Sequence, residues 1–235
     1  MNTRELAQKL GSVEVIYSDK NARSNSSIQP FDYLLVLDFE ATCWNNLDSK
    51  KKQSEIIEFP VVLYDVKNNE IVAEFQQYVI PTEHPKLSDF CIQLTGIQQN
   101  QVDNGVPLPT CLLEFMRWIN EQMKLYNMDF PGGKGDGTKT CAFVTWSDWD
   151  LGVCLKKECN RKRIHCHKMF RKWIDVRALY KLHFKRPLTG LSGALLDLGL
   201  QFEGKEHCGL HDARNTARLV GKMIEKGVIL RLTKN

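Results

Sequence analysis

Two acidic residues stand two positions apart at the end of a strongly apolar stretch. Residues 33–43 read YLLVLDFEATC, an apolar run that ends in Asp38 and Glu40. Such a run is typical of a strand buried on both faces, and side chains two apart along a strand point to the same side. Two carboxylates that face the same way are costly to keep ionised unless a positive group lies between them, and a divalent metal ion is the usual one. The alternative is a pair of solvated acids at a strand end.

A third acid follows another predicted strand, over residues 140–146. The chain continues there with Ser147, Asp148, Trp149 and Asp150, and strand ends in α/β sheets commonly present functional groups. We expect Asp148 to cap the helix that begins at residue 149, which leaves Asp150 free to face a cleft. Acids in a first helical turn are also favoured by the helix dipole, so a purely structural role for Asp150 is the alternative.

A fourth acid, Asp212, opens the last predicted helix, over residues 211–226. Five residues earlier, His207 lies on a loop that contains Gly209. A histidine on such a loop can move while the aspartate stays fixed, which suits a proton-transfer group beside a metal ligand. His211 is adjacent to Asp212 and is expected to point elsewhere on the helix.

These residues need a sheet whose strand ends meet and helices that close over it. Apolar, β-branched runs predict five strands, the first three of them a meander with a tight turn at residues 67–70. The strands are expected within residues 33–43 and at 56–66, 71–80, 140–146 and 173–176. Helices are expected within residues 87–101, from 107 to 123, and at 149–160, 177–182, 191–198 and 211–226. The order indicates an α/β domain at residues 31–235, preceded by a loosely ordered leader at residues 1–30.

The composition is that of a folded protein with no membrane segment. The chain has 235 residues, of which 43% are hydrophobic and 26% charged, and no apolar run reaches the length that crosses a bilayer. No basic and apolar signal segment opens the sequence, so the eight cysteines are expected to be reduced thiols in the cytoplasm or the nucleus.

The positive charge is unevenly placed. The net charge is only +4, but residues 156–172 carry a dense group of Lys and Arg. This basic segment suits contact with a polyanion, and a solvated face is the alternative. The same region contains Cys154, Cys159, His165, Cys166 and His167, which raise the alternative of a structural zinc site; the spacing typical of zinc knuckles is absent.

In this order, the four acids and one histidine resemble the DEDDh 3′-to-5′ exonucleases. The resemblance extends from about residue 31 to the C-terminus, and it is strongest to the exoribonucleases that trim the 3′ ends of small RNA, histone mRNA and ribosomal RNA. The segments that carry it are VLDFEATC at 36–43, EIIEFP at 55–60, LSDFC at 87–91, LTGI at 94–97, SDWD at 147–150 and HCGLHD at 207–212.

The resemblance implies an RNase H-like fold with a central mixed five-stranded sheet flanked by helices. It also implies two bound Mg²⁺ or Mn²⁺ ions and the release of nucleoside 5′-monophosphates from RNA 3′ ends. The implied metal ligands are Asp38, Glu40, Asp150 and Asp212, and the implied catalytic residues are Glu40 and His207, with His207 as the general base. This agrees with the chemistry, because two metal ions can supply a hydroxide and stabilise both the attacked phosphorus and the leaving oxygen.

Substrate contacts are implied by the same resemblance. The terminal nucleotide is expected to lie against the backbone after the second acid, and Leu94 to wedge the terminal base. The implied contacts are Glu40, Ala41, Thr42, Leu94, Trp149 and His207. Core packing is the alternative role for Leu94. Trp149 and Trp173 are candidates for stacking on bases, and core packing is again the alternative.

Two rival functions remain open at this point. The first is an exonuclease of the same fold that acts on single-stranded DNA, because the five chemical residues say nothing about the 2′-hydroxyl. The second is an inactive RNA-binding module that keeps the cleft as a grip. The presence of all four acids disfavours the second.

Overall fold

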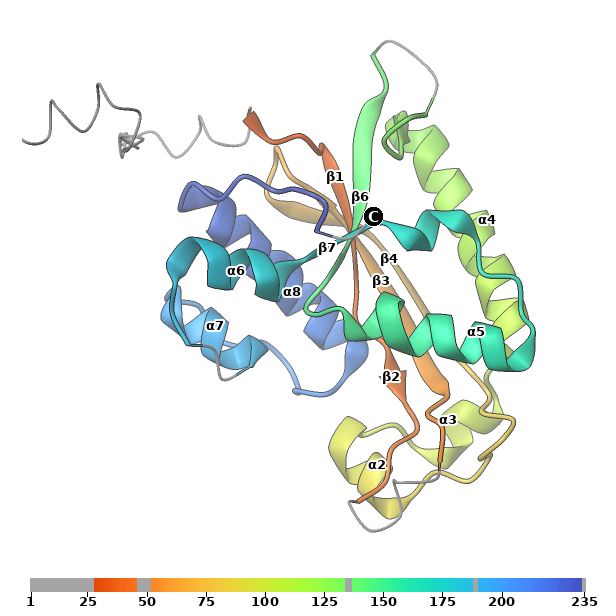
Figure 1. Cartoon of the computed structure of the whole chain (residues 1–235). Helices are drawn as coiled ribbons and strands as arrows, with labels where there is room; N and C mark the ends of the chain where they lie inside the picture. Colours follow the sequence, from red (N-terminus) through yellow and green to blue (C-terminus); the bar gives the residue numbers. More distant parts are fainter. Residues whose placement is uncertain (1–27, 46–51, 134–136, 188–189, 234–235) are drawn as a thin grey trace, which may run out of the picture.

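The structure, a computed structural model, describes residues 28–45, 52–133, 137–187 and 190–233, and it has one mixed sheet with helices on both faces (Figure 1). The long strand β3 (Ile56–Asp65) pairs antiparallel with β1 (Tyr33–Leu37) and β4 (Glu70–Tyr78). Strand β6 (Lys139–Thr145) pairs parallel with β1 and with β7 (Trp173–Asp175). The α/β architecture and the three-stranded meander are therefore confirmed.

The expected number of five strands is wrong, because the sheet has seven within the part of the chain that the structure describes. The two additional strands have two residues each: β2 (Glu40–Ala41) pairs with β3, and β5 (Met128–Asp129) pairs with β6. Both are too short to show an alternating pattern in the sequence. Strand β2 continues the line of β1 along β3 after a break at Asp38 and Phe39, and the register shifts between Glu40 and Ala41. The break separates the first acid from the strand.

Strand β1 lies at the centre of the molecule, and all five of its residues are buried. Leu34 and Val36 enter the core on one face, whereas Tyr33, Leu35 and Leu37 enter the core on the other. This alternation follows from the two-residue period of a strand, and it explains why the sequence there is continuously apolar.

Helices cover both faces of the sheet (Figure 1). One face packs against α6 (Val176–Phe184), α7 (Leu191–Asp197) and α8 (Gly209–Glu225). The other packs against α4 (Leu108–Tyr126), the π-helical segment η3 (Trp149–Leu155) and the short 3₁₀ helix η4 (Lys168–Arg171). Helix α5 (Lys156–Lys162) continues η3, and α2 (Asp89–Thr95) and α3 (Gln99–Asp103) lie beyond the end of the sheet, near β2.

The predicted helices all occur, with shifted ends. The expected helix at 149–160 is divided into η3 and α5, and α8 begins two residues earlier than expected, at Gly209. Residues 1–27 of the expected leader lie outside the described residues. Gln29, also in that expected leader, hydrogen-bonds to the backbone of Val228 and Leu230.

No helix in the described part of the chain is both long enough and apolar enough to span a lipid bilayer.

Candidate active site

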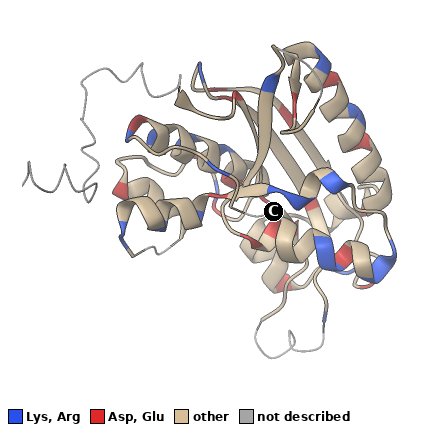
Figure 2. Ribbon diagram, turned by 45° about the horizontal axis from the view of Figure 1, so that its top comes forward, with Lys and Arg blue, Asp and Glu red and all other residues tan. Residues whose placement is uncertain are grey.

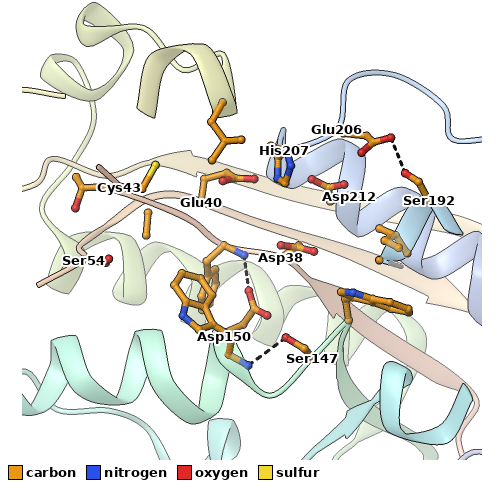
Figure 3. A pocket seen from close by; sticks show the side chains of 18 residues that line it. Asp38, Glu40, Cys43, Ser54, Ser147, Asp150, Ser192, Glu206, His207 and Asp212 are labelled. Carbon is orange, nitrogen blue, oxygen red and sulfur yellow. Dashed lines mark hydrogen bonds between the residues drawn. The ribbon is translucent and has the colours of Figure 1, made fainter. Parts of the chain in front are cut away.

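One cavity of about 500 Å³ brings the predicted chemical residues together (Figure 3). It lies where β1, the end of β6 and the start of α8 meet. Asp38, Glu40, Asp150, His207 and Asp212 all line it. The other lining residues are Phe39, Ala41, Thr42, Cys43, Ser54, Leu94, Trp146, Ser147, Trp149, Gly190, Leu191, Ser192 and Glu206.

The break between β1 and β2 places Asp38 and Glu40 in this cavity. Both residues are partly buried, and this loss of water raises the pKa of Asp38 and raises that of Glu40 to about 9. The negative charges of Asp150 and Asp212 contribute to both shifts. Asp38 and Glu40 are thus not solvated acids at a strand end.

The π-helical segment η3 presents Asp150 to the same place. Its Oδ1 atom accepts a hydrogen bond of 2.8 Å from the Phe39 amide, which lies between the first two acids. Asp150 is 3% exposed, and burial raises its pKa to about 7 although this hydrogen bond opposes the shift. A π-helix is rare and is frequently found at functional sites, so the irregular winding here is consistent with a functional Asp150.

Asp148, by contrast, does not cap the helix with its side chain. The predicted reason for choosing Asp150 over Asp148 as the acid in the cavity is therefore wrong. The Oδ1 atom of Asp148 instead accepts a hydrogen bond of 3.2 Å from the indole nitrogen of Trp173. Trp173 belongs to the core and is 8% exposed, which decides against its stacking on a base. The choice of Asp150 as the acid in the cavity agrees with the structure.

The loop before α8 brings His207 over the acids. The backbone of His207 is in the left-handed region, with φ of 61°, and it lies near enough to the Asp212 carboxylate to oppose the rise of its pKa. Burial raises the pKa of Asp212 to about 7. His211 points away as predicted, because its Nδ1 atom accepts a hydrogen bond of 3.0 Å from the Lys205 amide and the side chain does not line the cavity.

Glu58 is a residue of the site that the sequence analysis missed. It is 1% exposed on β3, and its Oε2 atom accepts a hydrogen bond of 3.0 Å from the Gly209 amide at the first turn of α8. Its Oε1 atom accepts one of 2.7 Å from Gln76. The N-cap residue of α8, Cys208, makes no capping hydrogen bond with its side chain. Glu58, from a distant part of the chain, supplies the capping acceptor instead. The signal in the sequence is an acid within the apolar run IIEFPVV.

Gly209 allows the close approach of α8 to the first acid. A Cβ atom at this position would lie 2.5 Å from the Asp38 carbonyl oxygen and 3.1 Å from Glu58 Oε2. The absence of a side chain therefore lets the segment with His207 and Asp212 pack directly against the end of β1.

The donor set suits divalent cations. Burial, together with the charges of neighbouring carboxylates, raises the pKa of all four acids in the cavity, so the site must take up protons or cations to offset their charge. All-oxygen ligands are the set that Mg²⁺ and Mn²⁺ prefer. Within the described ranges, no three His, Cys, Asp or Glu side chains converge as a complete metal-ligand set.

The expected substrate residues also line the cavity. Leu94 lies on its wall at the end of α2, and Trp149 is 41% exposed, so neither is a core residue. The backbone N–H of Thr42 is already used, because it donates to the Glu55 carbonyl at 2.8 Å, and Thr42 Oγ1 accepts from the Glu55 amide at 2.9 Å. Thr42 can therefore reach a ligand through its hydroxyl proton or its carbonyl oxygen, but not through its backbone N–H.

Part of the basic segment stabilises the fold. Figure 2 shows Lys and Arg gathered on α5 and the chain that follows it. Lys162 pairs with the buried carboxylates of Glu55, at 2.5 Å, and Glu158, at 2.7 Å. Arg161 pairs with Glu83 at 2.9 Å, whereas Lys156 and Lys157 are exposed. The exposed lysines of the segment, such as Lys156 and Lys157, are the ones available to a polyanion.

Three of the residues that raise the alternative of a structural zinc site have other surroundings. Cys154 and Cys159 are buried in the core, and His167 Nδ1 accepts a hydrogen bond from the Met169 amide. All eight cysteines are free thiols.

Comparison with known proteins defines the class to which this fold and site belong. The exonuclease family model RNase_T matches residues 35–220. The chain belongs to this exonuclease family, and its structural neighbours are DEDDh 3′ exonucleases with an RNase H-like fold.

Particular relatives are similar over most or all of the chain. Human ERI1 exoribonuclease 2 is 49% identical over 243 residues, and the match covers all of this chain but 35% of that protein. The 3′-5′ exonuclease Snipper of Drosophila melanogaster is 44% identical over 221 residues, with 93% of this chain and 79% of that protein covered. The crystal structure of the nuclease domain of 3′hExo, a DEDDh family member bound to rAMP, is 38% identical with a TM-score of 0.78, covering 88% of this chain and 98% of that one. The chain thus spans about a third of the length of the ERI1 exoribonuclease 2 relatives.

Proposed function

We propose that this chain is the catalytic domain of a divalent-metal-dependent 3′-to-5′ exoribonuclease. It removes nucleoside 5′-monophosphates one at a time from RNA 3′ ends. The observation that carries the proposal is the convergence of Asp38, Glu40, Asp150, His207 and Asp212 in one cavity. Relatives named exoribonucleases and the neighbour bound to rAMP support RNA as the substrate.

Each residue has a distinct task in this proposal. The four carboxylates would hold the cations, two Mg²⁺ or Mn²⁺ ions. Bound divalent cations lower the pKa of water and offset charge on the phosphate oxygens. Glu40 orients the attacking water, and an imidazole nitrogen of His207 takes the proton from it. The left-handed backbone of His207 presents the imidazole to the cavity beside the acids.

The terminal nucleotide occupies the end of the cavity formed by Ala41, Thr42 and Leu94. The Thr42 hydroxyl offers a hydrogen bond, while Leu94 and the exposed face of Trp149 offer apolar contact to a base. The exposed lysines of α5, Lys156 and Lys157, meet phosphates further upstream. The free thiols suit the reducing environment of the cytoplasm or the nucleus.

The test is digestion of RNA that carries a label at its 5′ end. With Mg²⁺ or Mn²⁺ we expect a ladder that shortens one nucleotide at a time and nucleoside 5′-monophosphates as products, and EDTA should stop the reaction. Asp38→Ala is expected to lower the rate by at least about 10³-fold, in the range that loss of a metal or charge-stabilising group produces. Asp148→Ala and His211→Ala are matched controls that should keep most of the activity. A single internal cut, or an equal loss at Asp148 and Asp150, would contradict the proposal.

An exonuclease that also acts on single-stranded DNA is the second candidate. The Drosophila relative is named a 3′-5′ exonuclease without restriction to RNA, and the acids and His207 do not select a sugar. Parallel digestion of RNA and DNA strands of the same sequence decides between the two candidates.

A further inference from the structure

The cavity extends beyond the acids to a second wall. Figure 3 places Cys43 and Ser54 at one end, Ser192 and Glu206 at the other, and the acids between them. The second wall consists of Trp146, Gly190, Leu191, Ser192 and Glu206. The proposed contacts of the terminal nucleotide use only the first end.

The two ends are built on different parts of the core. Ala41, at the first end, packs in the core that includes α4 and η3. Trp146 and Leu191, at the second end, pack in the core of α6, α7 and α8 on the opposite face of the sheet. The acids lie between these two ends of the cavity.

Trp146 is a rigidly held, partly exposed aromatic residue. It immediately follows β6, its carbonyl oxygen accepts a hydrogen bond of 3.0 Å from the Arg177 amide, and its side chain packs partly against the core. Part of the indole faces the cavity. A fixed aromatic surface beside a cleavage site is suited to contact with a nucleic-acid base or sugar, because every base has an aromatic face.

The polar groups of the second wall suit a nucleoside better than a phosphate. Ser192 Oγ donates a hydrogen bond of 2.7 Å to Glu206 Oε1, which leaves carboxylate lone pairs to accept from hydroxyl or amino groups. No Lys or Arg is among the cavity-lining residues that the structure describes, and Glu206 would repel a second phosphate.

We propose that this wall binds the penultimate nucleoside of the substrate, the one that keeps the new 3′-hydroxyl after cleavage. Its base or sugar lies against Trp146 and Leu191, and its hydroxyl or amino groups face Ser192 and Glu206. The inference rests on the proposed function, because the terminal nucleotide must occupy the first end of the cavity, beside Ala41, for the scissile phosphate to reach the acids. The second wall would then add affinity for any substrate longer than one nucleotide.

The experiment compares a ligand that fills only the terminal position with one that also carries the penultimate nucleoside. Adenosine 5′-monophosphate fills the terminal position, and a hydrolysis-resistant phosphorothioate ApA dinucleotide fills both. Calorimetry with Mg²⁺ gives the two affinities for the wild-type protein and for Trp146→Ala, Trp146→Phe and Leu196→Ala. Leu196 is the control, because it lies on the same helix as Leu191 but is 66% exposed and outside the cavity.

We expect Trp146→Ala to weaken ApA binding about tenfold or more, the range found when a base-stacking aromatic residue is removed. Its affinity for adenosine 5′-monophosphate should stay within about twofold, which also shows that the variant folds; Trp146→Phe should recover most of the ApA affinity. Equal weakening of both ligands, or unchanged ApA binding, would overturn the subsite while leaving the proposed function intact. Failure of the wild-type protein to bind adenosine 5′-monophosphate would overturn both.

Discussion

At the residue scale, each acid of the cavity is held in a place that costs free energy when it is charged. Asp38 and Glu40 are enclosed with other carboxylates, which raises the pKa of both. Asp150 receives a hydrogen bond from the backbone amide of Phe39. Because Phe39 lies between Asp38 and Glu40, this hydrogen bond also fixes the position of Asp150 relative to the first two acids.

The N-cap provided by Glu58 makes a prediction about α8. Glu58→Ala leaves the Gly209 amide without its buried acceptor, and we expect a stability loss of about 1–3 kcal/mol. Because the start of α8 positions His207 and Asp212, kcat should fall more than tenfold with a smaller change in KM. Glu58→Gln keeps a carbonyl acceptor and should recover much of kcat. Thermal unfolding and steady-state kinetics on a short RNA measure both effects, and a destabilised Glu58→Ala with normal kcat would show that Glu58 only stabilises the fold.

At the element scale, α5 is attached to the sheet by a buried group of charges. Lys162 lies between Glu55 on the chain before β3 and Glu158 on α5 itself. Glu158 Oε2 also accepts a hydrogen bond of 2.7 Å from the Ile56 amide, and Glu55 accepts hydrogen bonds from the amides of Thr82, Glu83 and His84. This group joins α5, the start of β3 and the loop after β4, next to the first end of the cavity, where Thr42 lies.

Removal of Lys162 tests this attachment. Lys162→Met leaves two buried carboxylates without their cation, and we expect a loss of about 3–5 kcal/mol in the free energy of unfolding. Lys157→Met is the matched control on the same helix, where the side chain is exposed and the change should stay within about 0.5 kcal/mol. At temperatures where both variants are folded, Lys157→Met should weaken RNA binding more than Lys162→Met, because the exposed Lys157 side chain is available to contact phosphate. Urea unfolding and RNA binding at several salt concentrations measure the two effects, and a small stability loss in Lys162→Met would contradict the assignment.

At the scale of the whole molecule, the cavity couples folding to protons and cations. Burial raises the pKa of Asp150 and Asp212 to about 7 and that of Glu40 to about 9. A carboxyl whose pKa is raised by folding stabilises the fold when it is protonated. That contribution is complete below the unfolded pKa of about 4 and is lost as the pH rises through the folded values.

We therefore expect the metal-free protein to lose stability as the pH rises from about 5 to about 9, with each lost kcal/mol lowering the Tm by about 3 °C in a chain of this length. Mg²⁺ should raise the Tm more at pH 8.5 than at pH 6, because cations then replace protons among the carboxylates. Thermal scans with EDTA and with Mg²⁺ at both pH values measure this. Glu40→Gln is the control, since it removes one carboxylate and should flatten the pH dependence; an equal Mg²⁺ effect at both pH values would contradict the coupling.

The elements that carry the site could be predicted because their signals are local. The apolar run before Asp38, the strand before Ser147 and the helix after Asp212 each show a period of their own. The two-residue strands β2 and β5 could not be found in this way, since two residues cannot show an alternation. The side-chain cap expected of Asp148 was wrong because Trp173, 25 residues away, offers a competing donor.

The sequence by itself determined the kinds of chemical residue, their order and the elements that present them, because strand and helix periods direct side chains to one side or another. Only the tertiary structure decided that Glu58 caps a helix 151 residues further along the chain. It also decided that Lys162 is held by buried acids and that Trp146 and Leu191 form a second wall of the cavity. These roles depend on which surfaces pack together across the sheet, and a local sequence pattern contains no information about the partner that each surface meets.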